Sequence, residues 1–127
     1  LDEAVDLVLK TLDESRGGET YISKIPSCRG IDLAEAMLPN GTTREVGIRE
    51  GEKLHEVMVT EHDSFRTWEY DHHYIIYPLG FDWWSEDRML PGGTPVKEFF
   101  EYSSGANEDW LSVEGIQERL QDIQIAH

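Results

Sequence analysis

Apolar residues recur along the chain with a helical period at its two ends and a strand-like pattern between them. The first apolar stripe consists of Leu1, Val5, Val8, Leu9 and Leu12. Charged residues fall largely on the other faces of this segment, so the pattern predicts an amphipathic helix over residues 1–15. Gly17 and Gly18 follow it, and glycine readily adopts the left-handed conformation that closes a helix.

Two further helices are predicted. Residues 31–38 are rich in strong helix formers, and one side of this segment carries Ile31, Ala34 and Leu38. The last apolar stripe consists of Val113, Ile116, Leu120 and Ile123. It predicts a closing helix over residues 113–123, with Ser112 as its N-cap because a serine hydroxyl can accept from the first free amides.

Short β-branched and aromatic segments, bounded by glycine and proline, predict strands. They are residues 19–25, 42–48, 57–60, 67–77 and 99–102. Residues 52–57 are predicted to open a helix that the strand of residues 57–60 follows, although periodicity over so short a run cannot separate helix from strand. The glycines and prolines of residues 79–95 indicate an irregular loop that exposes Trp83 and Trp84, and residues 103–107 indicate a turn.

These elements predict a single domain over residues 1–127, of the α/β or α+β class, in which helices cover a small mixed sheet. A chain of 127 residues can bury a real core. No apolar run approaches the ~20 residues of a membrane helix, and no signal-peptide pattern opens the sequence. The single cysteine, Cys28, cannot form an internal disulfide, so we expect a cytoplasmic protein.

The chain is strongly acidic, with 11 Lys and Arg against 26 Asp and Glu and a formal net charge of -15. Such a field repels nucleic acid and acidic membranes, so neither is expected as a partner. Any phosphate-bearing ligand would have to be held by a local group of cations, which directs attention to the few arginines.

Residues 49–52 place an arginine, a turn glycine and an acid within four positions. The planar guanidinium of Arg49 matches phosphate oxygens two at a time, and the carboxylate of Glu52 accepts from sugar hydroxyls. Together they suit the two halves of a nucleoside diphosphate. The alternative is a solvated turn at the start of a helix, where Glu50 and Glu52 interact with the helix dipole.

Familiar catalytic and cofactor motifs are missing from the sequence. It contains no GxGxxG or P-loop, no GxSxG and no HExxH, and Cys28 has no assigned base. Adjacent strand residues point to opposite faces, so we expect one of His72 and His73 to face solvent and the other a wall, rather than both to share a metal ion. We therefore predict no catalytic, cofactor-binding or metal-binding residues. Trp83 and Trp84 are more typical of loop packing or an interface anchor than of a stacking platform.

Six segments, taken in order, resemble the C-terminal part of the bacterial nucleotide-sugar 4,6-dehydratases, within the extended short-chain dehydrogenase/reductase family. They are LDEAVDLVL from Leu1, GETYISKIPS from Gly18, DLAEA from Asp32, GIREGEKLHEV from Gly47, EYDHHYIIY from Glu69 and FEYSSGANEDWLSV from Phe100. The most similar sub-type is the inverting UDP-N-acetylglucosamine 4,6-dehydratase of polysaccharide biosynthesis, followed by the retaining dehydratases and the UDP-sugar epimerases.

The resemblance implies a parent enzyme whose N-terminal Rossmann domain carries NADP and the catalytic residues. In that enzyme NADP oxidises the sugar C4 hydroxyl, water is lost across C5 and C6, and hydride returns to C6. The match begins at the first residue, inside a predicted helix, so we expect this chain to be the C-terminal substrate-binding lobe without its Rossmann domain. The family's Arg-x-Gly-acid motif implies that Arg49 holds the diphosphate and Glu52 the ribose.

Three residues depart from the family pattern. Glu50 stands where relatives commonly have proline, so a looser turn is expected. Cys28 and Ile31 stand where a methionine and a capping threonine are usual, so the second helix should start less firmly.

We therefore expect a UDP-sugar-binding lobe that is inactive alone, that works with the Rossmann domain of the parent enzyme, and that forms a homo-oligomer. The alternative is a stand-alone, non-enzymatic interaction module that self-associates through the apolar face left by a missing domain. The sequence leaves open which sugar is bound and whether the course at C5 is inverting or retaining.

Overall fold

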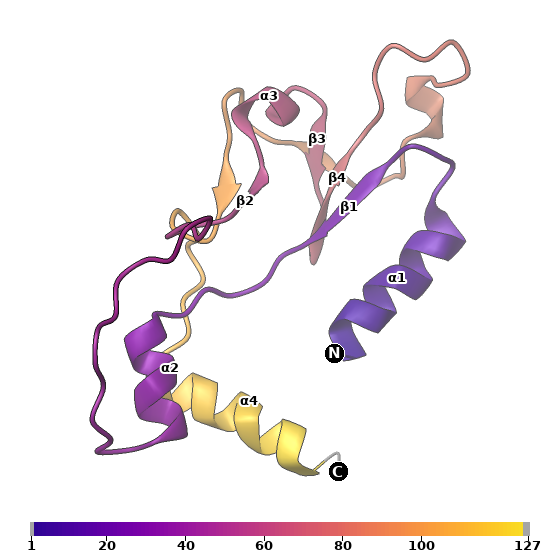
Figure 1. The fold of residues 1–127 in the computed structure, drawn as a ribbon. Helices are drawn as coiled ribbons and strands as arrows, with labels where there is room; N and C mark the ends of the chain where they lie inside the picture. The colour runs from indigo at the N-terminus through magenta and orange to yellow at the C-terminus, as the bar shows by residue number, and fades with distance from the viewer. Residues whose placement is uncertain (1, 126–127) are drawn as a thin grey trace. The chain divides into compact units, whose positions relative to one another are not determined.

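The computed structural model describes residues 2–125, and side chains as far as residue 122 (Figure 1). In chain order the elements are α1 (Asp2–Glu14), β1 (Thr20–Ser23), α2 (Gly30–Met37), β2 (Val57–Val59), α3 (Glu61–Ser64), β3 (Thr67–Glu69), β4 (His73–Ile76), η1 (Glu86–Arg88), β5 (Thr94–Pro95), β6 (Tyr102–Ser103) and α4 (Val113–Ile125). The predicted places of Leu1 and of the Ile123 side chain on helix faces lie outside this description.

The chain divides into two compact units. The sheet unit contains Leu1–Lys24 and Val57–Ser103, and the helical unit contains Ile25–Glu56 and Ser104–His127. The α and β class predicted from the sequence is confirmed. The strand pairings differ from the predicted mixed sheet, because every ladder between the named strands is antiparallel.

The sheet unit is built on β4, which is buried along its whole length. The strand order is β1-β4-β3-β5, and β2 pairs with β6 in a separate two-stranded ladder. Val59, Tyr74 and Tyr102 form the core cluster, in which the tyrosine rings lie 5.1 Å apart. Aromatic and β-branched side chains therefore fill this core, as their strand propensities predict.

The single strand predicted over residues 67–77 is wrong, because this segment is the β3–β4 hairpin. Glu69 pairs with Tyr74, and Tyr70 N donates to His73 O at 2.9 Å across the turn. Asp71 and His72 are exposed at its tip. A polar pair inside an aromatic segment therefore reverses the chain without a glycine or proline.

The predicted strand over residues 99–102 is also wrong, since only Tyr102 and Ser103 pair with β2. Phe99 has a φ of 61°, in the left-handed region, which interrupts an extended strand. Residues 79–95 are largely irregular, as predicted, but they include η1 and end in β5. Trp83 is exposed as predicted, whereas Trp84 is half-buried against Tyr77.

The first helix is confirmed as α1, and it ends before Gly17 and Gly18, whose φ values are 108° and 85°. Its apolar stripe is exposed to solvent in the structure. The exposed members are Val5, Val8, Leu9 and Leu12. The amphipathic pattern thus predicted the helix but not a partner that buries its apolar face.

The helical unit packs α2 against α4, which confirms both predicted helices. Among the side chains that the structure describes in this unit, Ala36 and Ile116 are the buried apolar residues, whereas Ile31 and Leu38, expected on the packed side of α2, are exposed. The small alanine lets the neighbouring helix approach closely. Ser112 Oγ accepts from Gly115 N at 3.2 Å, so Ser112 caps α4 as predicted. Arg29 occupies the N-cap position of α2, and its side chain makes no capping hydrogen bond.

Residues 37–57 are exposed throughout. The predicted strand over residues 42–48 is wrong, because neither face of that segment is buried and it pairs with no strand among the described residues. The predicted helix over residues 52–57 is wrong as well, whereas the strand expected to follow it is confirmed as β2. Leu54 is 77% exposed, so a helix there would gain nothing from packing.

Candidate functional site

The candidate site is the tight turn of residues 49–52 in the helical unit. Glu52 N donates to Arg49 O at 3.1 Å, and Gly51 has a φ of 85°. A positive φ at the third residue is the mark of a type II turn, and glycine adopts it without a steric penalty. The sequence therefore determines the turn through Gly51.

The turn brings Arg49 and Glu52 together, as the sequence predicts. Glu52 Oε2 accepts from Arg49 N at 2.8 Å, and Glu52 Oε1 lies 3.9 Å from Arg49 Nε. The two side chains remain 82% and 51% exposed. The backbone contact orients the carboxylate, and the longer contact holds the guanidinium only weakly.

This arrangement suits a ligand with an anionic group next to a diol. A guanidinium donates to two phosphate oxygens at once, and an ionised carboxylate can only accept, as from paired hydroxyls. Val46, Ile48 and Leu54 are exposed on the same segment. Exposed apolar residues therefore flank the turn in the sequence.

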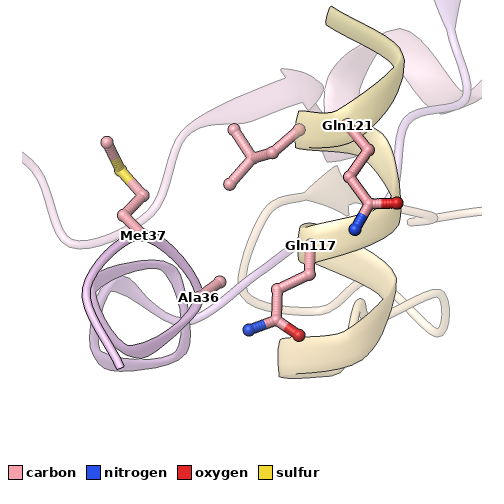
Figure 2. A pocket seen from close by; sticks show the side chains of 5 residues that line it. Ala36, Met37, Gln117 and Gln121 are labelled. Atoms are coloured by element: carbon pink, nitrogen blue, oxygen red, sulfur yellow. The ribbon is translucent and has the colours of Figure 1, made fainter. Parts of the chain in front are cut away.

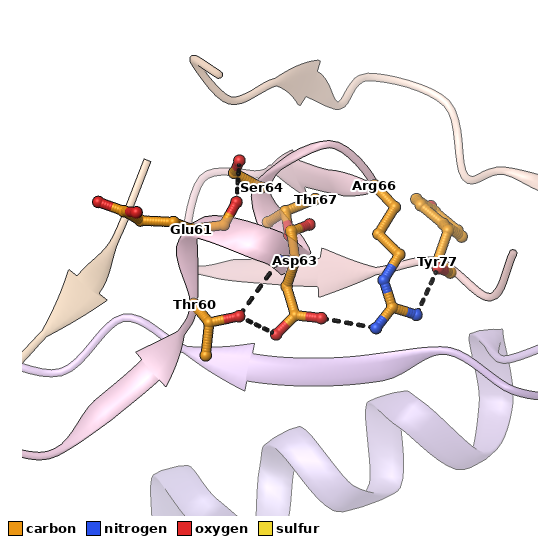
Figure 3. Close-up of polar contacts among 7 residues, drawn as sticks. All are labelled: Thr60, Glu61, Asp63, Ser64, Arg66, Thr67 and Tyr77. Atoms are coloured by element: carbon orange, nitrogen blue, oxygen red, sulfur yellow. Dashed lines mark hydrogen bonds and ion pairs between the residues drawn. The ribbon is translucent and has the colours of Figure 1, made fainter. Parts of the chain in front are cut away.

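Other arginines are engaged more firmly. Arg66 Nη2 donates to Asp63 Oδ1 at 2.6 Å and Arg66 Nη1 to Tyr77 O at 3.4 Å, while Thr60 Oγ1 donates to the other carboxylate oxygen of Asp63 (Figure 3). The hydrogen bond from Thr60 lowers the pKa of Asp63 most, and the hydrogen bond from Arg66 lowers it further. Arg29 likewise donates to Asp32 at 2.6 and 2.8 Å. Both guanidinium groups are thus held by internal acids.

The histidine pair is divided as predicted, with His72 exposed and His73 buried. His73 is stacked between Tyr21 and Tyr70, with ring centroids 5.6 and 5.1 Å away. Burial lowers the pKa of His73. Among the described residues there is no group of three or more His, Cys, Asp or Glu side chains that could hold a metal ion.

Sequence reasoning missed a tyrosine pair that attaches the 79–95 loop to the hairpin. Tyr70 Oη donates to Leu90 O at 2.9 Å, and Tyr77 Oη accepts from Leu90 N at 3.0 Å. The two hydroxyls lie 2.7 Å apart. Burial raises the pKa of Tyr70, which keeps the hydroxyl protonated as a donor. No local signal links these distant residues.

The helical unit also contains a hollow of about 430 Å³ between α2 and α4. Its lining consists of Ala36, Met37, Gln117, Leu120 and Gln121 (Figure 2). These side chains are neutral, so the hollow offers no cation to a phosphate, and the turn of residues 49–52 remains the stronger candidate site.

The chain resembles known proteins over most of its length. A family described as polysaccharide biosynthesis protein matches residues 1–78, which include the candidate turn. The inverting UDP-N-acetylglucosamine 4,6-dehydratase of Campylobacter jejuni subsp. jejuni serotype O:2 is 40% identical over 117 residues, covering 88% of this chain and 35% of the relative. Its counterpart from serotype O:23/36 is 38% identical with the same coverage.

A solved structure has a similar fold. Pen from Bacillus thuringiensis superposes with a TM-score of 0.79 at 26% identity, over 98% of this chain and 37% of that protein. The chain spans about a third of the length of the curated relatives it matches. None of the helices within residues 2–125 is long and apolar enough to cross a membrane. The family match covers more than half of the sequence, and the chain therefore belongs to the polysaccharide biosynthesis protein family.

Proposed function

We propose that this chain is the UDP-sugar-binding lobe of an enzyme similar to UDP-N-acetylglucosamine 4,6-dehydratase. Arg49 binds the diphosphate, and Glu52 accepts from the ribose hydroxyls. The observation that carries the proposal is the turn of residues 49–52, which presents an exposed guanidinium beside an oriented carboxylate. The names of the two Campylobacter relatives supply the substrate class.

The lobe contributes binding and orientation rather than bond-making. Holding the nucleotide at two points restricts the orientation of the attached sugar. Positioning of this kind lowers the reaction barrier, because translational and rotational freedom is lost on binding rather than in the chemical step. In the parent enzyme NADP supplies the oxidant. This chain does not fit that cofactor, because its glycines form neither the GxGxxG nor the P-loop pattern that cradles a pyrophosphate. We assign cofactor and catalytic residues to the Rossmann domain of the parent enzyme and expect no activity from this chain alone.

The test is a titration of the chain with UDP and with uridine. Binding is measured by calorimetry and by the shifts of the NMR amide signals of residues 49–52. We expect binding of UDP but not of uridine. Hydrogen bonds to a charged group contribute about 1.5 to 3 kcal/mol, so Arg49→Ala should weaken UDP binding roughly ten- to a hundredfold. Arg44→Ala is the matched control, since Arg44 is an exposed arginine of the same segment.

Glu52 is tested separately, because its role concerns the ribose. Glu52→Gln should cause a smaller loss than Arg49→Ala, since an amide oxygen still accepts from one hydroxyl. Glu50→Gln removes an equal charge from the same turn and should leave affinity unchanged. Equal effects of Glu50→Gln and Glu52→Gln would contradict the ribose assignment, and an unchanged affinity in Arg49→Ala would contradict the diphosphate assignment.

A second candidate function is a non-enzymatic module that self-associates. The observation in its favour is the exposed apolar stripe of α1, in which Leu12 is 74% exposed. Binding of neither UDP nor uridine at millimolar concentration, together with a stable oligomer formed through α1, would favour this alternative.

A further inference from the structure

The sheet unit contains a hollow of about 390 Å³, and no residue of the turn 49–52 belongs to its lining. Its apolar lining includes Phe65, Trp68, Leu79, Trp84, Met89 and Val96. This volume lies in the usual range of ligand sites, and aromatic side chains form part of its wall. The hollow can therefore bury an apolar stem of several methylene groups.

Two carboxylates belong to the same lining, those of Glu86 and Glu98. Neither carboxylate has a hydrogen bond or ion pair within the part of the chain that the structure describes. Aromatic faces and unpaired carboxylates both attract a cation. The lining thus favours a ligand that combines a positive charge with an apolar stem.

Arg66 is the cation in this lining, and its charge is already compensated. Its guanidinium is held by Asp63 at 2.6 Å and by Tyr77 O at 3.4 Å, as Figure 3 shows. Arg88 lies two positions after Glu86 in η1, and it donates to the carbonyls of Trp83 and Arg16. Neither arginine neutralises the two glutamates.

An exposed aromatic pair extends the surface beside the hollow. Phe65 and Phe99 meet edge to face at 5.3 Å and are 57% and 65% exposed. Phe99 has a φ of 61°, and its N–H donates to Ser64 Oγ at 3.0 Å. A bulky residue in this region is strained, and such strain persists where the surroundings impose it. The backbone therefore holds an apolar ring at the surface, next to Glu98.

We propose that this surface is a docking site for a basic segment of a partner protein. A lysine side chain enters the hollow, with its stem against the aromatic residues and its ammonium group beside Glu86 and Glu98. An apolar residue next to that lysine packs on Phe65 and Phe99. The net charge of -15 favours the approach of such a basic partner at long range.

The test uses two peptides, acetyl-Leu-Lys-Leu-amide and its analogue with norleucine in place of lysine. Norleucine keeps the stem and removes the ammonium group. At low ionic strength we expect the lysine peptide to shift the indole N–H signals of Trp68 and Trp84 saturably. The norleucine peptide should bind at least about fivefold more weakly, since each exposed charge pair contributes modestly. Added salt should reduce the difference.

Matched variants separate a local site from the general field of the chain. Glu86→Gln with Glu98→Gln should weaken the lysine peptide about fivefold. Asp6→Asn with Asp13→Asn removes the same charge from exposed positions of α1 and should leave binding unchanged. Equal losses in both double variants would overturn the proposal, as would equal binding of the two peptides. Butylammonium binding as tightly as the lysine peptide would overturn the assignment to a protein segment. UDP titration is independent of all these outcomes.

Discussion

Arginine residues in this acidic chain differ in how firmly a carboxylate holds them. Arg29 and Arg66 donate to acids at 2.6 Å, whereas the closest approach of Arg49 Nε to Glu52 is 3.9 Å. Exposed ion pairs of that length contribute little to stability. Arg49 can therefore turn toward a ligand at small cost, and its partner acid stays in place through the backbone N–H of Arg49.

His73 provides a pH test at the same scale. It is 4% exposed, and its Nε2 has no partner among the described atoms. Burial lowers the pKa of His73, nearby Lys10, His72 and Lys24 lower it further, and Glu14 opposes them. The folded pKa lies below the unfolded value of 6.5, so the neutral form stabilises the fold fully above that value. This contribution is lost as the pH falls below 6.5.

Urea unfolding at pH 7 and pH 5 measures the effect. The midpoint of the natural chain should fall more over this interval than that of His73→Phe, which cannot protonate. His62→Gln should behave like the natural chain, because His62 is exposed and is not among the groups that shift the pKa of His73. Parallel pH dependences of the natural chain and His73→Phe would show that His73 does not gain a proton on unfolding.

At the scale of elements, the turn of residues 49–52 has a residue at its second position that does not favour the turn conformation most strongly. A type II turn favours proline at its second position, which is Glu50 here. Proline fixes its own φ angle, so Glu50→Pro should favour the turn conformation over its alternatives by about 0.4 to 1 kcal/mol. UDP should then bind roughly two- to fivefold more tightly in calorimetry. Gly51→Ala should act in the opposite direction, because Gly51 has a φ of 85°. Weaker binding by Glu50→Pro would mean that the bound turn differs from the free one.

The sequence predicted correctly those elements that are determined by neighbouring residues. Helix periodicity and stop or cap residues such as Gly17 and Ser112 defined α1 and α4, and the glycine of residues 49–52 defined the candidate turn. The β3–β4 hairpin was missed because its reversal depends on Asp71 and His72, which lack the usual turn chemistry. Residues 42–48 have β-branched content but no partner strand, and pairing is a tertiary property that propensity does not contain.

The two candidate sites also differ in how far the sequence predicts them. Four consecutive residues were enough to place Arg49 beside Glu52, because one turn joins them. The hollow of the sheet unit is assembled from residues between Ser64 and Glu98. No spacing rule connects Phe65 with Glu86 or Glu98, so only the folded arrangement reveals that they share a surface.

At the scale of the whole molecule, the exposed stripe of α1 and the net charge oppose each other. Apolar surface favours self-association, whereas a charge of -15 on each copy opposes it. Added salt screens the repulsion and leaves the apolar attraction. Association of the chain should therefore increase with ionic strength.

Light scattering across a salt series tests this balance. Leu12→Asp should give a monomer at every salt concentration, because Leu12 is 74% exposed on the stripe. Leu54→Asp is the matched control, since Leu54 is 77% exposed but lies outside α1. A monomeric natural chain at high salt would exclude the self-associating module, and equal effects of the two substitutions would remove α1 from the interface.

The central place of β4 also sets an order of events during synthesis. The β3–β4 hairpin joins neighbouring residues, so it needs only a short loop to close, whereas β1 must wait for a strand that pairs Thr20 with Ile76. Distant pairings form later because a long loop must close first. During synthesis, the residues of β1 leave the ribosome well before those of its partner strand β4 have been made. The edge of β1 is then open to other chains, and a chaperone that covers residues 20–23 in that interval would protect the yield of folded protein.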